Sequence, residues 1–264
     1  MWLDGIFMAD SFYARWTDRY DADNQTAWDD IVLQFDLIEE HTRNETTGLL
    51  AHGYDESKVA VWADPITGSA PLVWSRAVGW YFLSLLEVLE VFPQSHPGYE
   101  RLLEYYTWLA EALKASQDSE SGGWWLIMSE QYVGAEGNYI ESSGMAMFTY
   151  GWFKGIRDGH LQEDEYLGPA KKAYEGMTSQ FLEPEDDGTV TWHGTVEVGS
   201  LSSNGTYEVR LLVCIVSSRW SFEANSSFSI TSGSLWFQTT SRELGHLCWL
   251  PTNGKVGRRR PLLK

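Results

Sequence analysis

The chain has 264 residues, enough for one large domain or two small ones. Its net charge is −18, with 35 acidic and 11 basic residues in 1–208 but 2 acidic and 8 basic in 209–264. The acidic body has no basic stripe for nucleic acid, and it repels anionic ligands at long range, so binding one requires local cations. No stretch approaches the roughly 20 apolar residues of a membrane span. We therefore expect neither nucleic acid nor a membrane as a partner.

Aromatic residues make up 14% of the chain, including 14 tryptophans. In clefts, Trp and Tyr offer a flat apolar face with one polar handle, which suits stacking on sugar rings, although most of these side chains are expected in the core. Both cysteines, Cys214 and Cys248, follow residue 208, so a disulfide framework does not hold the body together. The histidines of the body lack the spacing of metal ligands, and no metal or cofactor is expected.

Periodic apolar residues predict that the body is helical. Gly and Pro pairs mark residues 48–70 as a loop. The Gly/Ser-rich residues 118–137 form a second loop, with a short hairpin around Trp124–Tyr132. The expected helices run from Leu3 past Trp16 and then over about 25–42, 74–92, 98–116, 140–158 and 163–182.

Three polar residues recur at the starts of alternate predicted helices. Asp4, Arg76 and Ser143 stand 72 and 67 residues apart. A period near 70, with one helical hairpin per unit, is typical of an α/α toroid. There the starts of successive hairpins meet at one end of the ring, so distant residues share one pocket. The body has room for about three such hairpins.

The character of the chain changes after Glu208. The charge reverses, Ser and Thr become frequent, and helical periodicity ends, although Leu211–Val216 has the composition of a strand. One interpretation of residues 209–264 is a basic, partner-binding appendage. We favour a second, in which this irregular tail comes from a retained intron or a frameshift, because neighbouring residues there agree on no structure.

Four segments of the body carry a family likeness. They are residues 1–5 (MWLDG), 48–56 (GLLAHGYDE), 74–81 (WSRAVGWY) and 138–143 (NYIESS). In this order they resemble the unsaturated rhamnogalacturonyl hydrolases of glycoside hydrolase family 105, related to the unsaturated glucuronyl hydrolases of family 88. The likeness covers residues 1–208. It implies an all-α fold, here a partial (α/α)6 barrel without its N-terminal hairpins and with a tail foreign to the family.

The resemblance also implies a reaction. Family members remove the terminal Δ4,5-unsaturated galacturonic acid from rhamnogalacturonan and other pectin oligosaccharides. An Asp protonates the C4=C5 vinyl ether and assists water addition at C5, after which the hemiketal opens and the glycosidic bond breaks. Asp4 matches this residue, but the family's second functional Asp and a pocket Trp have no counterpart. The N-terminus is expected to be missing, which leaves the compartment unassigned.

Three alternatives stay open at this point. The chain is an inactive fragment, a non-catalytic carbohydrate-binding protein, or another toroid enzyme such as a sugar epimerase or an ordinary glycosidase. The last would process saturated substrates, and replacement of Asp4 by Asn would then matter little.

Each polar candidate has a functional and a structural interpretation. Apolar flanks disfavour the ionised form of Asp4, which suits a proton donor, but Asp also caps helices. In the motif, His52 is expected to hydrogen-bond the uronate or orient water, whereas an isolated His is an ordinary surface residue. Arg76 is expected to hold the substrate carboxylate through two parallel hydrogen bonds, or to be a buried partner of an acidic residue.

The aromatic candidates are weaker. Trp74 and Trp80 are expected to stack on the sugar or line the pocket wall, with core packing equally open for Trp80. Trp124, in a Gly-rich loop, is expected to be exposed and to form an outer subsite. Glu141 and Ser142 open a helix, where an acidic residue such as Glu141 suits the helix dipole, and structural capping is the role expected of Ser142 and Ser143.

Overall fold

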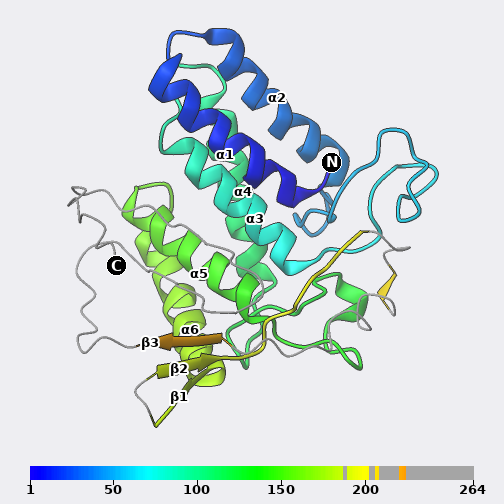
Figure 1. The fold of residues 1–264 in the computed structure, drawn as a ribbon, viewed down its shortest axis with the longest axis vertical. Helices are drawn as coiled ribbons and strands as arrows, with labels where there is room; N and C mark the ends of the chain where they lie inside the picture. The colour runs from blue at the N-terminus through cyan, green and yellow to red at the C-terminus, as the bar shows by residue number, and fades with distance from the viewer. Residues whose placement is uncertain (187–188, 202–205, 208–219, 224–264) are drawn as a thin grey trace, which may run out of the picture. The chain divides into compact units, whose positions relative to one another are not determined.

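The computed structural model describes residues 1–186, 189–201 and 206–207, and the backbone of residues 220–223 (Figure 1). They fall into two compact units. The first contains Met1–Phe181 and the described part of Gly194–Ser218, and the second contains Leu182–His193 with the strand at 220–223. The candidate residues all lie in the first unit.

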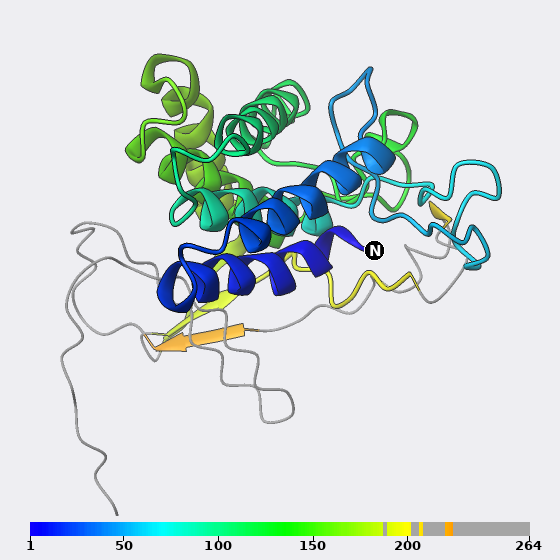
Figure 2. The ribbon, with the colours of Figure 1, turned by 90° about the horizontal axis from the view of Figure 1, so that it is seen from above.

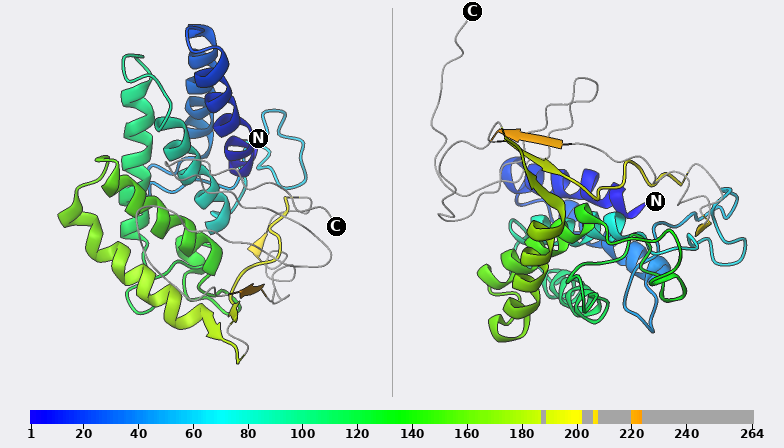
Figure 3. Two further views of the ribbon diagram at one scale, coloured as in Figure 1. Left: turned by 60° about the vertical axis from the view of Figure 1, so that its left-hand side comes forward. Right: turned by 90° about the horizontal axis from the view of Figure 1, so that it is seen from below.

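Six helices form three consecutive hairpins in the first unit (Figures 1 and 3). Short links within each pair make its helices antiparallel neighbours. The helix prediction is confirmed, with differences of a few residues at the ends. The pairs are α1 (Leu3–Tyr20) with α2 (Gln25–Thr42), α3 (Ser75–Leu89) with α4 (Tyr99–Ala115), and α5 (Ser142–Arg157) with α6 (Glu163–Phe181).

The helix starts use different caps. Asn24 accepts a hydrogen bond from Ala27 N at the start of α2, and Glu141 accepts one from Gly144 N at the start of α5. The residue before α1 is Trp2, which has no side-chain cap. Asp4 lies in the first turn of α1, so the interpretation of Asp4 as the helix cap is wrong.

Helix α3 is the centre of the unit. It packs against α1 on one side and α5 on the other, and 13 of its 15 residues are buried. Helices α2 and α4 lie against α3 as well (Figure 2), through Phe35 on Tyr81 and Tyr106 on Phe82. Alternate helices α1, α3 and α5 therefore form one layer. This arrangement of helical hairpins is consistent with the predicted toroid.

Three further residues have the same spacing as the polar residues at the helix starts. Arg15, Glu87 and Lys154 are spaced by the same 72 and 67 residues as Asp4, Arg76 and Ser143, one on each helix of the layer. Arg15 is ion-paired with Glu87, and Lys154 Nζ lies 3.1 Å from Glu90. Equivalent positions therefore lie at equivalent heights along the three helices, which places Asp4, Arg76 and Ser143 at one end of the layer.

The two long loops differ in part from expectation. No hairpin forms over Trp124–Tyr132. Instead Ile127 pairs with Trp74 and Trp125 with Ile140, and Glu130–Tyr132 is a short 3-10 helix. Trp2 pairs with Gly53 in the other loop. The backbone partners of the two loops thus come from residues at and just before the helix starts, where the first N–H groups have no partner within the helix.

The second unit contains a small antiparallel sheet of order β1-β2-β3. Its strands are Leu182–Pro184, Thr189–Trp192 and Trp220–Glu223. The all-α prediction missed it, because a strand such as Thr-Val-Thr-Trp is too short for a recognisable alternation. Strand β3 lies within the predicted irregular tail. The remainder of that tail, including Leu211–Val216, lies outside the described residues, and its origin stays a prediction.

Across the described part of the chain, none of the helices combines the length and the apolar character that crossing a bilayer requires.

Candidate active site

The candidate site lies where the starts of α1, α3 and α5 meet the interhelical loops. Each start is anchored by one backbone hydrogen bond. The amide N–H groups of Leu3, Ser75 and Ser142 donate to the carbonyls of His52, Leu126 and Gly194, each at 3.0 Å. These three residues are equivalent in the 72- and 67-residue spacing. An equivalent hydrogen bond therefore attaches each of the three helix starts to a neighbouring loop segment.

Asp4 and His52 form the first element of the site. His52 Nε2 lies 3.1 Å from Asp4 Oδ2, and their protonation states decide which of them donates. The Asp4 side chain is 24% exposed and that of His52 is 1% exposed. The carboxylate thus keeps an open edge for a ligand, whereas His52 meets Asp4 from the buried side.

His52 is enclosed by aromatic rings. Its ring centroid lies 4.9 Å from that of Trp74 and 5.7 Å from that of Trp2. This burial contradicts the interpretation of His52 as a surface residue. It also removes the geometric basis for direct contact with a uronate. The role that the geometry supports is to hold the Asp4 carboxylate in one orientation.

Arg76 is the second element. Its Nε donates to Ser143 Oγ at 2.7 Å, and its NH2 group donates to Val196 O and, at 3.3 Å, to Glu141 Oε1. NH1 makes a longer contact of 3.4 Å with Glu197 O. The interpretation of Arg76 as a partner of an acidic residue is thus correct in its geometry. Two parallel hydrogen bonds to a substrate would require the release of one of these partners.

Glu141 is a part of the candidate site that the sequence interpretation understated. Its side chain is 0% exposed and accepts from Gly144 N at 2.7 Å and from Val196 N at 3.0 Å. Ser143 Oγ donates to the same carboxylate at 2.8 Å. A buried carboxylate needs such donors to offset its lost hydration. Its place directly before a helix was the available signal, but a cap alone does not reveal a partner in α3.

The segment 194–201, which we name the strap, crosses the starts of α3 and α5. Thr195 Oγ1 hydrogen-bonds Ser142 Oγ at 2.7 Å, and the carbonyls of Val196 and Glu197 accept from Arg76. Gly199 lies so close to the Trp74 indole that a Cβ there would be 2.2 Å from one ring carbon. The strap therefore helps to bury Trp74 and limits access to Arg76.

The tryptophans divide into three cases. Trp74 is buried between His52 and Arg76, with the Arg76 guanidinium carbon 5.5 Å from its ring centroid. Trp80 is half-buried and packs on Phe7 with ring centroids 4.7 Å apart. Trp124 is fully buried and donates Nε1–H to Leu113 O, so the expectation of an exposed loop aromatic is wrong. The Gly-Gly-Trp sequence reflects close packing here.

Four predicted site residues thus form a continuous row of contacts, from Asp4 through His52 and Trp74 to Arg76. Trp80 lies one turn further along α3 and Trp124 in the core. The row combines an accessible carboxylate with a cation held by a buried acid. Such a pair can exchange a proton with one part of a ligand while attracting a negative charge on another.

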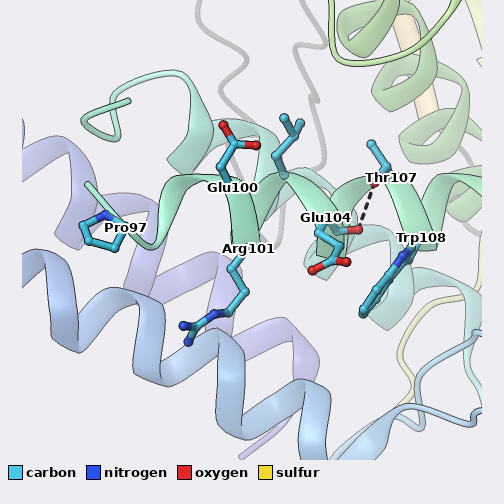
Figure 4. Close-up of a pocket in the computed structure, with 7 residues that line it drawn as sticks. Pro97, Glu100, Arg101, Glu104, Thr107 and Trp108 are labelled. Atoms are coloured by element: carbon cyan, nitrogen blue, oxygen red, sulfur yellow. Dashed lines mark hydrogen bonds between the residues drawn. The ribbon is translucent and has the colours of Figure 1, made fainter. Parts of the chain in front are cut away.

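Two other features of the unit lie outside this row. A shallow concavity follows the outer surface of α4 (Figure 4), lined by Glu100, Arg101, Glu104 and Trp108 among others. Its charged groups make ordinary surface contacts, such as Arg101 with Asp36. Within the part of the chain that the structure describes, no group of His, Cys, Asp or Glu side chains has the arrangement of a metal site.

Comparison with known proteins agrees with the geometry. The family model of Glycosyl Hydrolase Family 88 matches residues 1–213. The chain belongs to this family. The match covers all four motifs and the row from Asp4 to Arg76, and it confirms the resemblance predicted for residues 1–208.

Three relatives indicate the range of the family. An Agrobacterium fabrum protein is 34% identical over 164 residues, 61% of this chain and 69% of that protein. A structure from C. acetobutylicum ATCC 824, described as a glycoside hydrolase from family 105, is 32% identical with a TM-score of 0.76. An unsaturated 3S-rhamnoglycuronyl hydrolase from an Alteromonas species is 30% identical over 124 residues, 46% of this chain.

The relatives are longer than the aligned region. The match to the C. acetobutylicum structure covers 84% of this chain and 61% of that structure. The match to the Alteromonas enzyme covers 28% of that enzyme.

Proposed function

We propose that the chain acts as a family 88 type hydrolase that removes a terminal Δ4,5-unsaturated galacturonic acid from rhamnogalacturonan or pectin oligosaccharides. The observation that carries the proposal is the Asp4–His52 pair. It presents one carboxylate with an open edge at a helix start and holds it from behind with a buried imidazole 3.1 Å away. The name of the Alteromonas relative supports an unsaturated glycuronyl substrate.

In the proposed reaction, Asp4 performs the proton transfers. The protonated carboxyl gives its proton to C4 of the vinyl ether, and positive charge develops at C5 and the ring oxygen. Water then adds to C5 as the Asp4 carboxylate takes one of its protons. The resulting hemiketal opens at the bond between C5 and the ring oxygen, and the hemiacetal left at C1 then collapses to an aldehyde and releases the second sugar. His52 restricts the carboxylate to one orientation, so less conformational freedom is lost on reaching the transition state.

Arg76 attracts the uronate carboxylate in this proposal. The acidic body repels an anion, so a local cation is required. The 3.4 Å contact between NH1 and Glu197 O is the longest of the four that Arg76 makes, and it is the one a substrate carboxylate would replace. Nε and NH2 stay with Ser143, Glu141 and Val196, so the guanidinium does not rotate when substrate binds.

The test follows the C4=C5 double bond directly. The purified chain is incubated with an unsaturated galacturonyl-rhamnose disaccharide, and the ultraviolet absorbance of the double bond is recorded. We expect absorbance to fall with the wild-type chain and to fall at least about a hundredfold more slowly with Asp4→Asn. Asp18→Asn is the matched control, because Asp18 lies on the same helix with an exposed side chain. It should retain full activity.

An experiment in heavy water distinguishes protonation at C4 from hydrolysis at the anomeric carbon. Protonation of a vinyl ether moves a solvent-derived proton to C4 in the catalysed step, so the reaction should be slower in heavy water and deuterium should enter the product at C4. Hydrolysis at the anomeric carbon would instead release the leaving sugar before the absorbance of the double bond falls. Release of sugar from the saturated disaccharide would favour an ordinary glycosidase and overturn the proposal.

A second candidate is a non-catalytic carbohydrate-binding protein, and the contacts of Arg76 favour it. All four are hydrogen bonds to the protein itself, and those to Ser143 and Val196 are short, so the guanidinium is already occupied. Saturable disaccharide binding by the wild-type chain without any loss of absorbance would support this candidate. Under it, Asp4→Asn would leave the affinity nearly unchanged.

A further inference from the structure

The concavity on the outer surface of α4 contains an exposed tryptophan that rests on a fixed side chain. Trp108 is 49% exposed, and the Arg43 guanidinium carbon lies 5.8 Å from its ring centroid. Arg43 is itself held by two hydrogen bonds to Glu39 and one to Gly48 O. The cation therefore supports the indole from one side, and the remaining side is open to solvent.

Polar groups of both kinds lie beside the indole. Arg101, Glu104 and Trp108 point to one side of α4 (Figure 4), as their spacing of three and four residues requires. Arg101 NH1 pairs with Asp36, which leaves its other guanidinium nitrogens as donors. The carboxylates of Glu100 and Glu104 are exposed and serve as acceptors. The concavity thus combines a flat apolar surface, donors and acceptors over about 10 Å of helix.

The outer helices on both sides of this concavity are in place. On one side, Arg101 contacts Asp36 of α2. On the other, Glu111 accepts a hydrogen bond from the Tyr166 hydroxyl of α6 at 3.0 Å. Helix α4 belongs to the middle hairpin of the three, so the exposure of Trp108 does not depend on which hairpin stands first or last in the described chain.

The internal repeat shows that an aromatic residue is unusual at this position. Spacings of 74 and 64 residues match the buried residues of α2 to those of α4 and those of α4 to those of α6. The matched buried sets are Trp28, Leu102 and Tyr166, then Val32, Tyr106 and Ala170, then Phe35, Leu109 and Ala173. Trp108 then corresponds to Gln34 and Lys172, which are polar, as the solvated face of a helix generally is. Packing within the repeat therefore does not explain Trp108.

We propose that this concavity binds a neutral saccharide, at a site separate from the candidate active site. The apolar face of a sugar ring can stack on an indole, and each sugar hydroxyl both donates and accepts, which matches the mixed lining. Two carboxylates, Glu100 and Glu104, face one guanidinium that Asp36 already neutralises, so an anionic uronate is disfavoured. A cationic ligand would meet Arg101. The support of Trp108 by Arg43 reduces the entropy lost on binding.

The test is a titration of the full chain with a neutral galactose trisaccharide, followed by saturation-transfer NMR of the sugar. We expect saturable binding with a dissociation constant on the order of 1 mM. Trp108→Ala removes the stacking surface and should weaken binding at least about tenfold. Glu104→Gln replaces a charged acceptor with a neutral one and should weaken it about fivefold. Trp16→Ala is the matched control, because Trp16 is 51% exposed on α1, and it should bind like the wild type.

Circular dichroism of each variant establishes that the helices are retained. Lack of saturable binding by the wild-type chain would overturn the proposal, and so would an equal loss with Trp16→Ala. A galacturonic acid trisaccharide that binds as tightly as the neutral one would overturn the ligand class. A dimer that depends on Trp108, seen by light scattering without bound sugar, would assign this surface to a second copy instead.

The binding test is independent of the proposed enzymatic activity. Asp4→Asn should leave the affinity for the neutral trisaccharide unchanged while it slows the loss of the double bond. If Asp4→Asn abolished binding of the trisaccharide, the sugar would be in the candidate active site, and the proposal for α4 would be wrong.

Discussion

Glu141 and Arg76 face each other across 65 residues of sequence, with Arg76 NH2 3.3 Å from Glu141 Oε1. The carboxylate has no contact with solvent, and the guanidinium is mostly covered. This pair connects α3 to the start of α5, and both partners also bind the strap through Val196. It joins three parts of the chain that carry the candidate site.

Removal of one partner should be more damaging than removal of both. Arg76→Ala leaves the Glu141 carboxylate buried without its cation, and we expect the free energy of unfolding to fall by about 3–5 kcal/mol. Adding Glu141→Gln to that variant should recover part of the loss. Urea titrations followed by circular dichroism measure both. Arg101→Ala is the control, because its ion pair with Asp36 is half exposed and worth about 0–1 kcal/mol.

His52 should act as a positioning residue. His52→Ala removes the support of Asp4, and we expect kcat on the unsaturated disaccharide to fall by about a hundredfold while KM changes little, because the His52 side chain is buried behind Asp4. His52→Gln places an amide near the position of Nε2 and should restore part of kcat. Equal losses with Ala and Gln, together with a raised KM, would argue for a direct substrate contact instead.

Asp10 should make stability depend on pH. Burial, with a smaller contribution from the charge of Asp30, raises the pKa of Asp10 from 3.8 to about 7. Because the folded pKa is raised, the stabilising contribution is fully present below the unfolded value and is lost as pH rises through about 7. Asp10→Asn cannot ionise, so it should lose about 2–4 kcal/mol less than wild type between about pH 5 and pH 9.

Thermal or urea unfolding across that range provides the measurement for Asp10. Asp18→Asn, with an exposed side chain on the same helix, should follow the wild-type curve. Parallel curves for wild type and Asp10→Asn would contradict the prediction.

Two glycines should respond in opposite directions to substitution by Ala. A Cβ on Gly199 would overlap the Trp74 ring at 2.2 Å, so Gly199→Ala should displace the strap and cost about 1–3 kcal/mol. Gly168 lies inside α6 with open space around it, so Gly168→Ala should stabilise the chain by about 0.5–1 kcal/mol. Melting temperatures of the two variants, shifted in opposite directions from wild type, are the expected result.

The helices could be predicted well because their signal is local. Apolar residues at helical spacing, Pro93 after α3 and the cap at Asn24 lie within a few positions of the elements they define. The period near 70 residues came from the same kind of observation, repeated three times. The failures also have a local cause. The residues of 124–132 have the composition of strands, but their partners are Trp74 and Ile140, which no short window contains.

For the candidate site, the sequence by itself determined which side chains were the candidates: Asp4, Trp74 and Arg76 stand in motifs at recurring helix starts, and His52 stands in the motif of the loop between α2 and α3. Only the tertiary structure decided which of them are buried and which groups they contact. It buried His52 behind Asp4, paired Arg76 with Glu141 and placed the strap over both. Motif spacing is a property of neighbouring residues, whereas burial and side-chain pairing depend on segments far apart in the chain, such as Arg76 with Glu141, 65 residues away, and with Val196, 120 residues away. Those segments meet only when the helices pack.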